Sequence, residues 1–256
     1  MGHISQEKKT LVIYSYFEKN KQYIDNFRFF LEHGTKDSET DYFIVVNGET
    51  SVHYHTSNIL SLKRKNEGFD FGAWTDALSL INTDKYDYFI FLNCTARGPF
   101  LPSWAEKQSW VKLFTDKIND QTKLVGPTIS GHNGQPHVQS FLLTTDKVGL
   151  DVAKKAGIFN TKKSSKLEAI DKEILFSTEI LRAGYNIGCM LASYNGIDFR
   201  KNSWVCANSD HAGDPWYSNR YFGVNINPFE VLFFKANRNV TPEILEKYTN
   251  WMYLRK

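Results

Sequence analysis

The chain has 256 residues, of which 41% are hydrophobic and 23% are charged, and its net charge is +3. A globular protein of this length buries enough apolar surface to fold without disulfides or metal, and so small a charge argues against nucleic acid as a partner. The three cysteines lack a metal-binding spacing, and no stretch has the pattern of a signal peptide or a transmembrane segment, so we expect reduced thiols and a cytoplasmic location.

Strand-like and helix-like segments alternate through the first third of the chain. Apolar, β-rich runs predict strands at residues 11–17, 42–48, 58–65 and 86–92. Apolar residues at helical spacing predict helices at residues 21–34 and 69–81. This alternation predicts an α/β fold with a mixed, mostly parallel, Rossmann-like sheet flanked by helices, which binds ligands at the carboxyl ends of its strands.

The rest of the chain is predicted to extend the sheet and then to become irregular. We expect strands at residues 123–129, 137–145 and 185–191, and helices at residues 109–118, 146–157, 165–184 and 242–254. No repeat or linker divides the chain, so residues 1–256 are expected to form a single domain. In it, residues 1–9 are expected to be disordered and residues 195–256 to form an irregular C-terminal portion.

The turn between the strand at 58–65 and the helix at 69–81 is a candidate ligand site. Gly68 and Gly72 permit a close approach of the backbone, and the start of a helix favours anionic groups. Asp70 is expected either to cap this helix or, together with Asn66, to hydrogen-bond the base or sugar of a nucleotide. Neither a P-loop nor a dinucleotide fingerprint is present, which argues against kinases and dehydrogenases.

Four stretches, taken in order, resemble glycosyltransferases of the GT-A type found in bacterial, algal and large-virus polysaccharide assembly. They are NEGFDFGAW (66–74), YDYFIFLNCTARGPF (86–100), GPTISGHNGQPHVQSF (126–141) and NPFEVLFFKANR (227–238). The resemblance implies a GT-A-like fold, a nucleotide-diphosphate sugar donor, with uridine diphosphate favoured, and a carbohydrate or glycolipid acceptor. It also implies donor-binding roles for Ser15, Tyr16, Phe17, Asn66, Asp70, Gly72, Asn93 and Thr95.

The triplet Asn93-Cys94-Thr95 departs from the pattern of this family, because many members carry Asp-x-Asp at this position. Asp-x-Asp holds Mg²⁺ or Mn²⁺ against the diphosphate, since hard divalent ions prefer anionic oxygen ligands. An amide, a thiol and a hydroxyl supply no negative charge, so we expect little or no dependence on an ion bound at this triplet.

Two alternatives remain for the charge of the diphosphate. A divalent ion is held from elsewhere, for which Asp210, His211 and Asp214 are the best local cluster, although these residues equally fit an ordinary loop. In the other alternative, Lys235 and Arg238 neutralise the diphosphate, with Arg97 also nearby in the sequence. Lys235 and Arg238 equally fit a solvated surface.

An inverting transferase needs a carboxylate that takes the proton of the acceptor hydroxyl. In the helix at 165–184, Glu173 borders an apolar stripe beside Ser177, and the resemblance makes Glu173 the preferred base and Asp171 the second choice. An exposed acidic helix face without a catalytic role is the alternative.

Acceptor contacts are expected from two places. Alternation along the strand at 137–145 places His137, Gln139 and Phe141 on one face, so His137 and Gln139 are predicted to contact the acceptor sugar. Trp216 is predicted either to stack on that sugar or to anchor its loop to the core.

Taken together, the sequence predicts an inverting hexosyl- or pentosyltransferase of polysaccharide biosynthesis. A non-catalytic nucleotide- or glycan-binding module on the same fold is the first alternative. A nucleotidyltransferase is disfavoured, because its two-metal chemistry needs carboxylates that are absent at positions 93 and 95.

Overall fold

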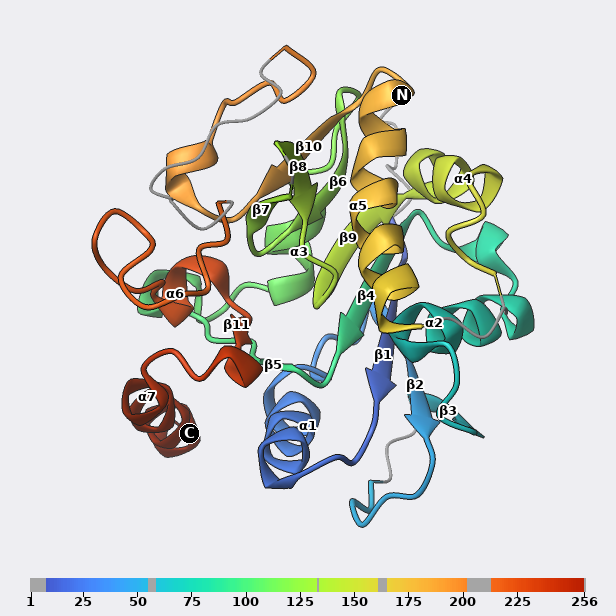
Figure 1. The fold of residues 1–256 in the computed structure, drawn as a ribbon. Coiled ribbons are helices and arrows are strands. Elements are labelled where there is room, and N and C mark those ends of the chain that lie inside the picture. The colour runs from blue at the N-terminus through green and yellow to red at the C-terminus, as the bar shows by residue number, and fades with distance from the viewer. Residues whose placement is uncertain (1–7, 55–58, 133, 161–164, 202–212, 256) are drawn as a thin grey trace, which may run out of the picture.

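A seven-stranded sheet forms the centre of the molecule, with its strands in the order β10, β6, β9, β4, β1, β2, β3 (Figure 1). The computed structural model describes residues 8–54, 59–132, 134–160, 165–201 and 213–255. Strand β9 runs antiparallel to β4 and β6, and the other neighbours are parallel. The predicted fold class is therefore confirmed. The strands are β1 (Thr10–Tyr16), β2 (Thr40–Asn47), β3 (Ile59–Arg64), β4 (Tyr88–Asn93), β6 (Thr122–Gly126), β9 (Leu142–Asp146) and β10 (Asn186–Cys189).

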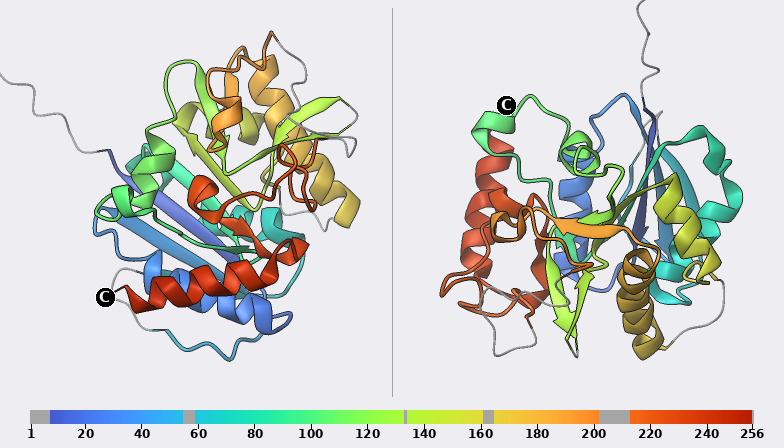
Figure 2. Two further views of the ribbon diagram at one scale, coloured as in Figure 1. Left: turned by 90° about the vertical axis from the view of Figure 1, so that its left-hand side faces the viewer. Right: turned by 90° about the horizontal axis from the view of Figure 1, so that it is seen from above.

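Helices cover both faces of this sheet (Figure 2). Helices α2, α4 and α5 lie on one face, and α1 and α3 lie on the other, where α7 packs outside α1. Strand β1 is buried along its whole length, as expected for a central strand between two helical layers. The helices are α1 (Lys21–His33), α2 (Phe69–Leu80), α3 (Trp110–Thr115), α4 (Lys147–Lys155), α5 (Lys166–Arg182), α6 (Pro228–Val231) and α7 (Pro242–Leu254).

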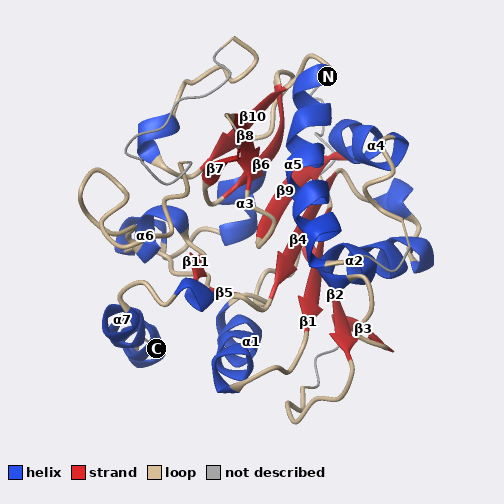
Figure 3. Cartoon of the chain, in the orientation of Figure 1, coloured by secondary structure: helices blue, strands red, loops and turns tan. Residues whose placement is uncertain are grey.

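The described end of the chain, residues 213–255, consists largely of loops before α7 (Figure 3). Two short strand pairs lie outside the main sheet and bring distant segments together. Strand β11 (Phe234–Lys235) pairs with β5 (Ala96–Arg97), and β7 (Ile129–His132) pairs with β8 (Gln135–Val138). Because β5 directly follows β4, the first pair places Lys235 next to the carboxyl end of the sheet.

Capping side chains fix where two of the helices begin. Asn20 accepts a hydrogen bond from the backbone N–H of Tyr23 at 3.1 Å at the start of α1. Ser165 and Glu168 form a capping box at the start of α5, with the Ser165 hydroxyl accepting from the Glu168 N–H. The capping box sets the first turn of α5 and so the position of Glu173, which lies two turns into that helix.

One predicted strand is wrong, because residues 137–145 belong to two strands in different sheets. Strand β8 ends at Val138 and β9 begins at Leu142, so the predicted alternation of His137, Gln139 and Phe141 does not continue through this segment. The chain turns at Ser140, whose backbone N–H donates to the Glu173 carboxylate at 2.6 Å. A helix on the neighbouring layer therefore fixes a turn that carries no Gly or Pro signal.

Candidate active site

The carboxyl ends of β1 and β4 meet the first turn of α2, as the sequence predicted. Ser15 and Asn93 are partners in the parallel register of β1 and β4. Asp70 accepts a hydrogen bond from the Ser15 hydroxyl at 3.0 Å and from the Asn93 amide at 2.8 Å. Three of the predicted donor-site residues are therefore in direct contact.

The backbone before α2 directs Asp70 into this contact. Gly68 and Phe69 both adopt left-handed conformations, with φ of 72° and 53°, and the helix begins without a side-chain cap. A bulky residue at positive φ costs on the order of 1–3 kcal/mol, which the surrounding structure must offset. Asp70 therefore does not cap α2, and its carboxylate lies across the ends of two strands.

Asn47, at the end of β2, extends the cluster and was not predicted. Its amide donates to the Ser15 hydroxyl at 3.1 Å and to the Tyr16 carbonyl at 3.1 Å. Arg64 donates to the Asn47 oxygen at 2.7 Å and pairs with Asp76 at 2.5 Å. The sequence signal is a polar Asn at the end of the strand predicted at residues 42–48, where parallel strands place ligand-binding side chains.

Asp70 has an unusual proton affinity in this setting. Burial raises the pKa of Asp70 to about 6, and the charge of Glu173 acts in the same direction, against the lowering effect of the hydrogen bonds from Ser15 and Asn93. At neutral pH Asp70 is close to its titration range.

Glu173 projects from α5 and is held by the turn between β8 and β9. Its Oε2 accepts hydrogen bonds from the backbone N–H and the hydroxyl of Ser140, and its Oε1 lies 3.4 Å from Nε2 of His137. Burial alone opposes ionisation, but the His137 hydrogen bond, the charge of Lys235 and the Ser140 hydrogen bond lower the pKa of Glu173 to about 2. The carboxylate is therefore ionised at neutral pH, whereas Asp171 is exposed on the same helix.

Lys235 and Arg238, both predicted to bind the donor, have different surroundings. Arg238 pairs with Asp214 at 2.8 Å and lies over the ring of Tyr217, 5.2 Å from its centroid. Among the described residues Lys235 has no ion pair within 4 Å, and its ammonium group lies 5.3 Å from the Phe141 ring centroid. Burial lowers the pKa of Lys235. Lys235 is therefore a cation of this site without a direct ion-pair partner among the described residues, although the charges of Glu173 and Asp214 act on it from a longer distance.

The triplet does not present ligands to a divalent ion. The Asn93 oxygen accepts from the N–H and the hydroxyl of Thr95 at 3.0 and 2.5 Å, and its NH₂ group faces Asp70. Burial raises the pKa of the Cys94 thiol to about 12, so Cys94 stays neutral beside the backbone of Phe17. Both oxygens of Asp70 already accept hydrogen bonds.

Of the other metal candidates, only Asp214 lies within the described residues. Asp210 and His211 lie outside the described residues, and Asp214 is paired with Arg238. Within the described ranges no group of three or more His, Cys, Asp or Glu side chains is placed to hold an ion. The described residues at the triplet do not fit the divalent ion that an Asp-x-Asp motif holds.

Three predicted ligand contacts are occupied by packing. Tyr16 is buried, and its ring stacks on Phe27 with centroids 4.1 Å apart. Trp216 is 1% exposed and donates its ring N–H to Thr128 at 3.0 Å, so it anchors its loop to the core. Gln139 is buried between Thr128 and Asp214, at 2.6 and 3.3 Å. Their side chains position the site and do not face a ligand.

The remaining predicted residues surround the cluster. Phe17 and Asn66 are exposed, at the end of β1 and before α2. At Gly72 a Cβ atom would lie 2.6 Å from the Glu67 carbonyl oxygen, so this glycine permits close packing of α2 and not the approach of a ligand.

Arg97, which the sequence placed near the diphosphate, points away from the cluster. Its guanidinium donates to Asn26 at 2.8 Å, to Glu246 at 2.7 Å and to Thr249 at 3.0 Å, and the side chain is 2% exposed. Arg97 therefore joins α1 to α7 and is not available to a ligand.

No known protein family profile and no curated protein matches this sequence. Several solved structures have a similar course of the chain. A mannosyltransferase from Pyrobaculum calidifontis is 10% identical with a TM-score of 0.47, and the similarity covers 72% of this chain and 55% of that one. The catalytic domain of Drosophila β1,4-galactosyltransferase 7 is 11% identical with a TM-score of 0.42, over 72% and 65% of the two chains.

A third solved structure is more nearly this chain's length. It is a nucleotide-diphospho-sugar transferase, described as putative, from Desulfovibrio desulfuricans, 11% identical with a TM-score of 0.43, over 76% of this chain and 91% of that one. This chain spans only 55% and 65% of the mannosyl- and galactosyltransferase structures. Similarity of this order concerns the course of the chain, and the chemistry of the site is argued from its own residues.

Proposed function

We propose that the protein is a glycosyltransferase that moves a sugar from a nucleotide-diphosphate donor to a carbohydrate acceptor with inversion, without a divalent ion at the strand-end triplet. The observation that supports this best is that Glu173, an ionised carboxylate, and Lys235, a cation without an ion pair within 4 Å among the described residues, lie on either side of the Ser140–Phe141 turn, beside the carboxyl ends of the strands. A base for the attacking hydroxyl and a positive charge for the departing diphosphate are what this displacement needs.

Donor binding is assigned to the cluster at the ends of β1, β2 and β4. The Ser15, Asn47 and Asn93 side chains form a buried hydrogen-bonded network that holds Asp70, and Asp70 is the partly exposed member that we assign to the nucleoside. Uridine is favoured by the resemblance seen in the sequence. Lys235 faces the diphosphate, and Arg238 adds a partly exposed charge beside it. As the bond to the sugar breaks, negative charge grows on the diphosphate, and a fixed ammonium stabilises that charge more than it stabilises the bound donor.

Glu173 takes the proton of the acceptor hydroxyl as that oxygen attacks the anomeric carbon. In the ligand-free protein the charge of Lys235 contributes to the low pKa of Glu173. A diphosphate beside Lys235 offsets that charge and raises the pKa of Glu173, which makes it a stronger base. The donor thus prepares the base before the acceptor reacts.

His137 and Ser140 act on Glu173 and not on the sugar. Ser140 holds one carboxylate oxygen through its backbone and hydroxyl, and His137 approaches the other at 3.4 Å. The base is therefore fixed in direction by the turn after β8. His137 was predicted to contact the acceptor, and in the proposed mechanism its first role is to orient Glu173.

The test is release of nucleoside diphosphate from a panel of UDP- and GDP-sugars, each in EDTA and in Mn²⁺. We expect release from at least one donor in EDTA and little further gain with Mn²⁺. If no donor releases nucleoside diphosphate in either condition, the enzyme hypothesis is wrong and the alternative of a nucleotide- or glycan-binding module remains. The hydrogen bond from the Thr95 hydroxyl to the Asn93 oxygen, within the triplet, favours that alternative.

The length and apolar content of the described helices decide whether one of them could cross a membrane. None of them has the length and apolar character that crossing a bilayer requires. The cytoplasmic location and the carbohydrate or glycolipid acceptor remain our proposals, and the free thiols of Cys94 and Cys189 are consistent with a reducing compartment.

A further inference from the structure

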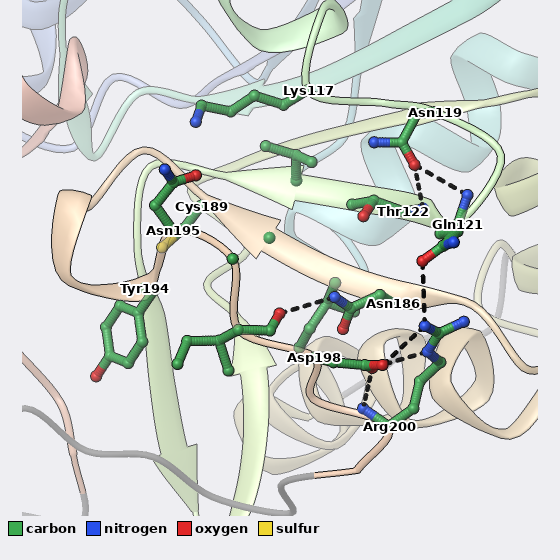
Figure 4. Close-up of a pocket in the computed structure, with 15 residues that line it drawn as sticks. Lys117, Asn119, Gln121, Thr122, Asn186, Cys189, Tyr194, Asn195, Asp198 and Arg200 are labelled. Atoms are coloured by element: carbon green, nitrogen blue, oxygen red, sulfur yellow. Dashed lines mark hydrogen bonds and ion pairs between the residues drawn. The ribbon is translucent and has the colours of Figure 1, made fainter.

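A polar cavity of about 350 Å³ lies at the far edge of the sheet, beside β10 (Figure 4). Its walls come from β10, from the start of β6 with the turn before it, and from the segment 194–200. None of the residues that form the candidate active site lines it. The cavity is therefore a separate hollow on the same molecule.

One wall of the cavity is held rigidly by its own hydrogen bonds. Asn186 binds the segment 194–200 through the Ile197 carbonyl and the Phe199 N–H, both at 2.9 Å. Arg200 pairs with Asp198 at 2.8 Å and donates to Gln121 at 3.3 Å. These contacts fix the segment to the start of β10 and to the turn before β6, so this wall of the hollow is held by the protein's own hydrogen bonds.

The opposite end of the cavity carries polar groups without partners. Lys117 and Asn195 reach toward each other there in Figure 4, and among the described residues neither side chain makes a hydrogen bond or ion pair. Together they supply an ammonium group, an amide NH₂ group and an amide oxygen. A ligand that both donates and accepts hydrogen bonds satisfies them.

The lining also has apolar surface and open backbone. Val125, Ile187 and Tyr194 are among the lining residues, but they are only 0%, 1% and 6% exposed, so the apolar part of the lining is small. At Gly188 a Cβ atom would meet its nearest neighbours at 3.5 and 3.6 Å, so the strand leaves space where a side chain would fit. Hydroxyl-binding groups beside apolar surface match the two kinds of face that a sugar ring presents.

We propose that this cavity binds a sugar unit of the acceptor at a distance from the reacting hydroxyl. The volume lies at the lower end of the roughly 300–1,000 Å³ of small-molecule pockets, which suits one or two sugar rings. Of the two cations in the described lining, Arg200 is paired with Asp198, and the lining is made mostly of amide, hydroxyl and backbone groups, which suit the hydroxyl groups of a sugar.

The cavity is connected to the active site through the ends of two strands. Cys189, in the lining, is the register partner of Gly126, and Met190 donates to the Gly126 carbonyl at 3.1 Å. Thr128, two residues further, holds Gln139, which in turn contacts Asp214. That the bound sugar belongs to the acceptor rests on the proposed function, whereas sugar binding itself does not.

Saturation-transfer difference NMR tests the cavity directly, without donor. The probes are the methyl glycosides of glucose, galactose, mannose and N-acetylglucosamine. We expect transfer to the ring protons of at least one probe. Lys117→Ala and Asn195→Ala should each weaken binding about 3- to 10-fold, because each removes one or two hydrogen bonds.

Two controls separate the cavity from the rest of the molecule. Lys112→Ala removes an exposed lysine from the same region and should leave probe binding unchanged. Asp70→Asn changes the active-site cluster and should also leave it unchanged. No transfer with any probe, equal transfer in wild type and both cavity variants, or a loss confined to Asp70→Asn would each overturn the proposal.

Donor hydrolysis distinguishes a failure of the cavity proposal from a failure of the proposed function. The cavity variants should release nucleoside diphosphate from the donor at the wild-type rate, because they do not touch the cluster at Asp70. Probe binding that is lost in the cavity variants supports the subsite even where the wild type hydrolyses no donor, and in that case the proposed function alone fails.

Discussion

The amide of Asn93 donates a hydrogen bond to the carboxylate of Asp70 at 2.8 Å, from the end of β4 to the first turn of α2. The carboxylate that the triplet lacks is thus supplied by a neighbouring helix, and the triplet binds it as a hydrogen-bond donor. The Asn93 amide stabilises the Asp70 carboxylate by donating a hydrogen bond to it. A second carboxylate at position 93 would need a cation between the two groups, because two ionised carboxylates in contact repel each other.

This contact predicts that Asn93→Asp creates a metal requirement. The substitution replaces a hydrogen bond by a like-charge contact, so the free energy of unfolding in EDTA should fall by about 1–3 kcal/mol. Mn²⁺ should then raise the melting temperature of the variant and leave that of the wild type unchanged. Asn93→Ser is the control, since it removes the amide without adding a charge. An equal response of wild type and Asn93→Asp to Mn²⁺ would contradict this account.

The raised pKa of Asp70 predicts a pH-dependent stability with a definite sign. Folding moves this pKa from 3.8 to about 6, so the folded state binds the proton more tightly than the unfolded state. The stabilising contribution is complete below about pH 4 and is lost as the pH rises through about 6, which amounts to roughly 3 kcal/mol. The free energy of urea unfolding should therefore decrease over this range in the wild type relative to Asp70→Asn.

The lowered pKa of Glu173 acts in the opposite direction and in a different range. Its contribution is present above about pH 4.5 and is lost as the pH falls through about 2. The comparison between wild type and Asp70→Asn should for this reason be made above pH 4. A difference between the two proteins that is flat from about pH 4 to about pH 7 would show that Asp70 is not perturbed.

Glu173→Gln tests the base. Loss of a general base lowers turnover by a factor of about 10²–10⁴, and the affinity for the donor nucleotide should change little. Asp171→Asn, on the exposed side of the same helix, should retain turnover. Because the pKa of Glu173 is far below neutrality, kcat/KM should have no acid limb near pH 6. An acid limb there that disappears in Asp70→Asn would transfer the role of base to Asp70.

The part of this site that the sequence could predict is the part set by the strands. Ser15 and Asn93 follow apolar runs, and parallel strands bring their carboxyl ends to one edge, so their proximity was predictable. Asp70 was predictable from the glycines before its helix. The predicted order of strands and helices follows from apolar periodicity, which local sequence carries.

What the sequence could not predict depends on contacts between distant segments. The hydrogen bond from the Ser140 backbone to Glu173 joins the turn between β8 and β9 to α5. This turn interrupts residues 137–145, whose alternation is typical of one continuous strand. Lys235 and Arg238 look alike in FFKANR, and only the position of Asp214 makes one of them compensated. Trp216 has the composition of a sugar platform, but burial against Thr128 decides its role.

The difference between the two cations predicts unequal effects on donor affinity. Lys235→Ala removes an uncompensated charge, so the Kd for UDP in EDTA should rise about 10- to 100-fold, the loss of one charge-assisted contact. Arg238→Ala should have a smaller effect, because Asp214 already offsets that charge. Lys247→Ala on the exposed side of α7 is the control for net charge. Isothermal titration calorimetry measures all three, and equal affinities for Lys235→Ala and Lys247→Ala would remove the diphosphate role of Lys235.

The contacts of Arg97 predict that its loss lowers the stability of the fold, and the same variant distinguishes a structural role of Arg97 from a role in ligand binding. Its guanidinium is 2% exposed and contacts Asn26 of α1 and Glu246 and Thr249 of α7. Arg97→Ala leaves the buried oxygens of Asn26 and Thr249 without donors, so the free energy of unfolding should fall by about 3–5 kcal/mol. Arg255→Ala is a milder comparison, since that side chain pairs with the exposed Glu106. Urea unfolding followed by tryptophan fluorescence measures both. If the Arg97→Ala protein were as stable as the wild type and bound UDP more weakly, Arg97 would be a donor-binding residue and not a structural one.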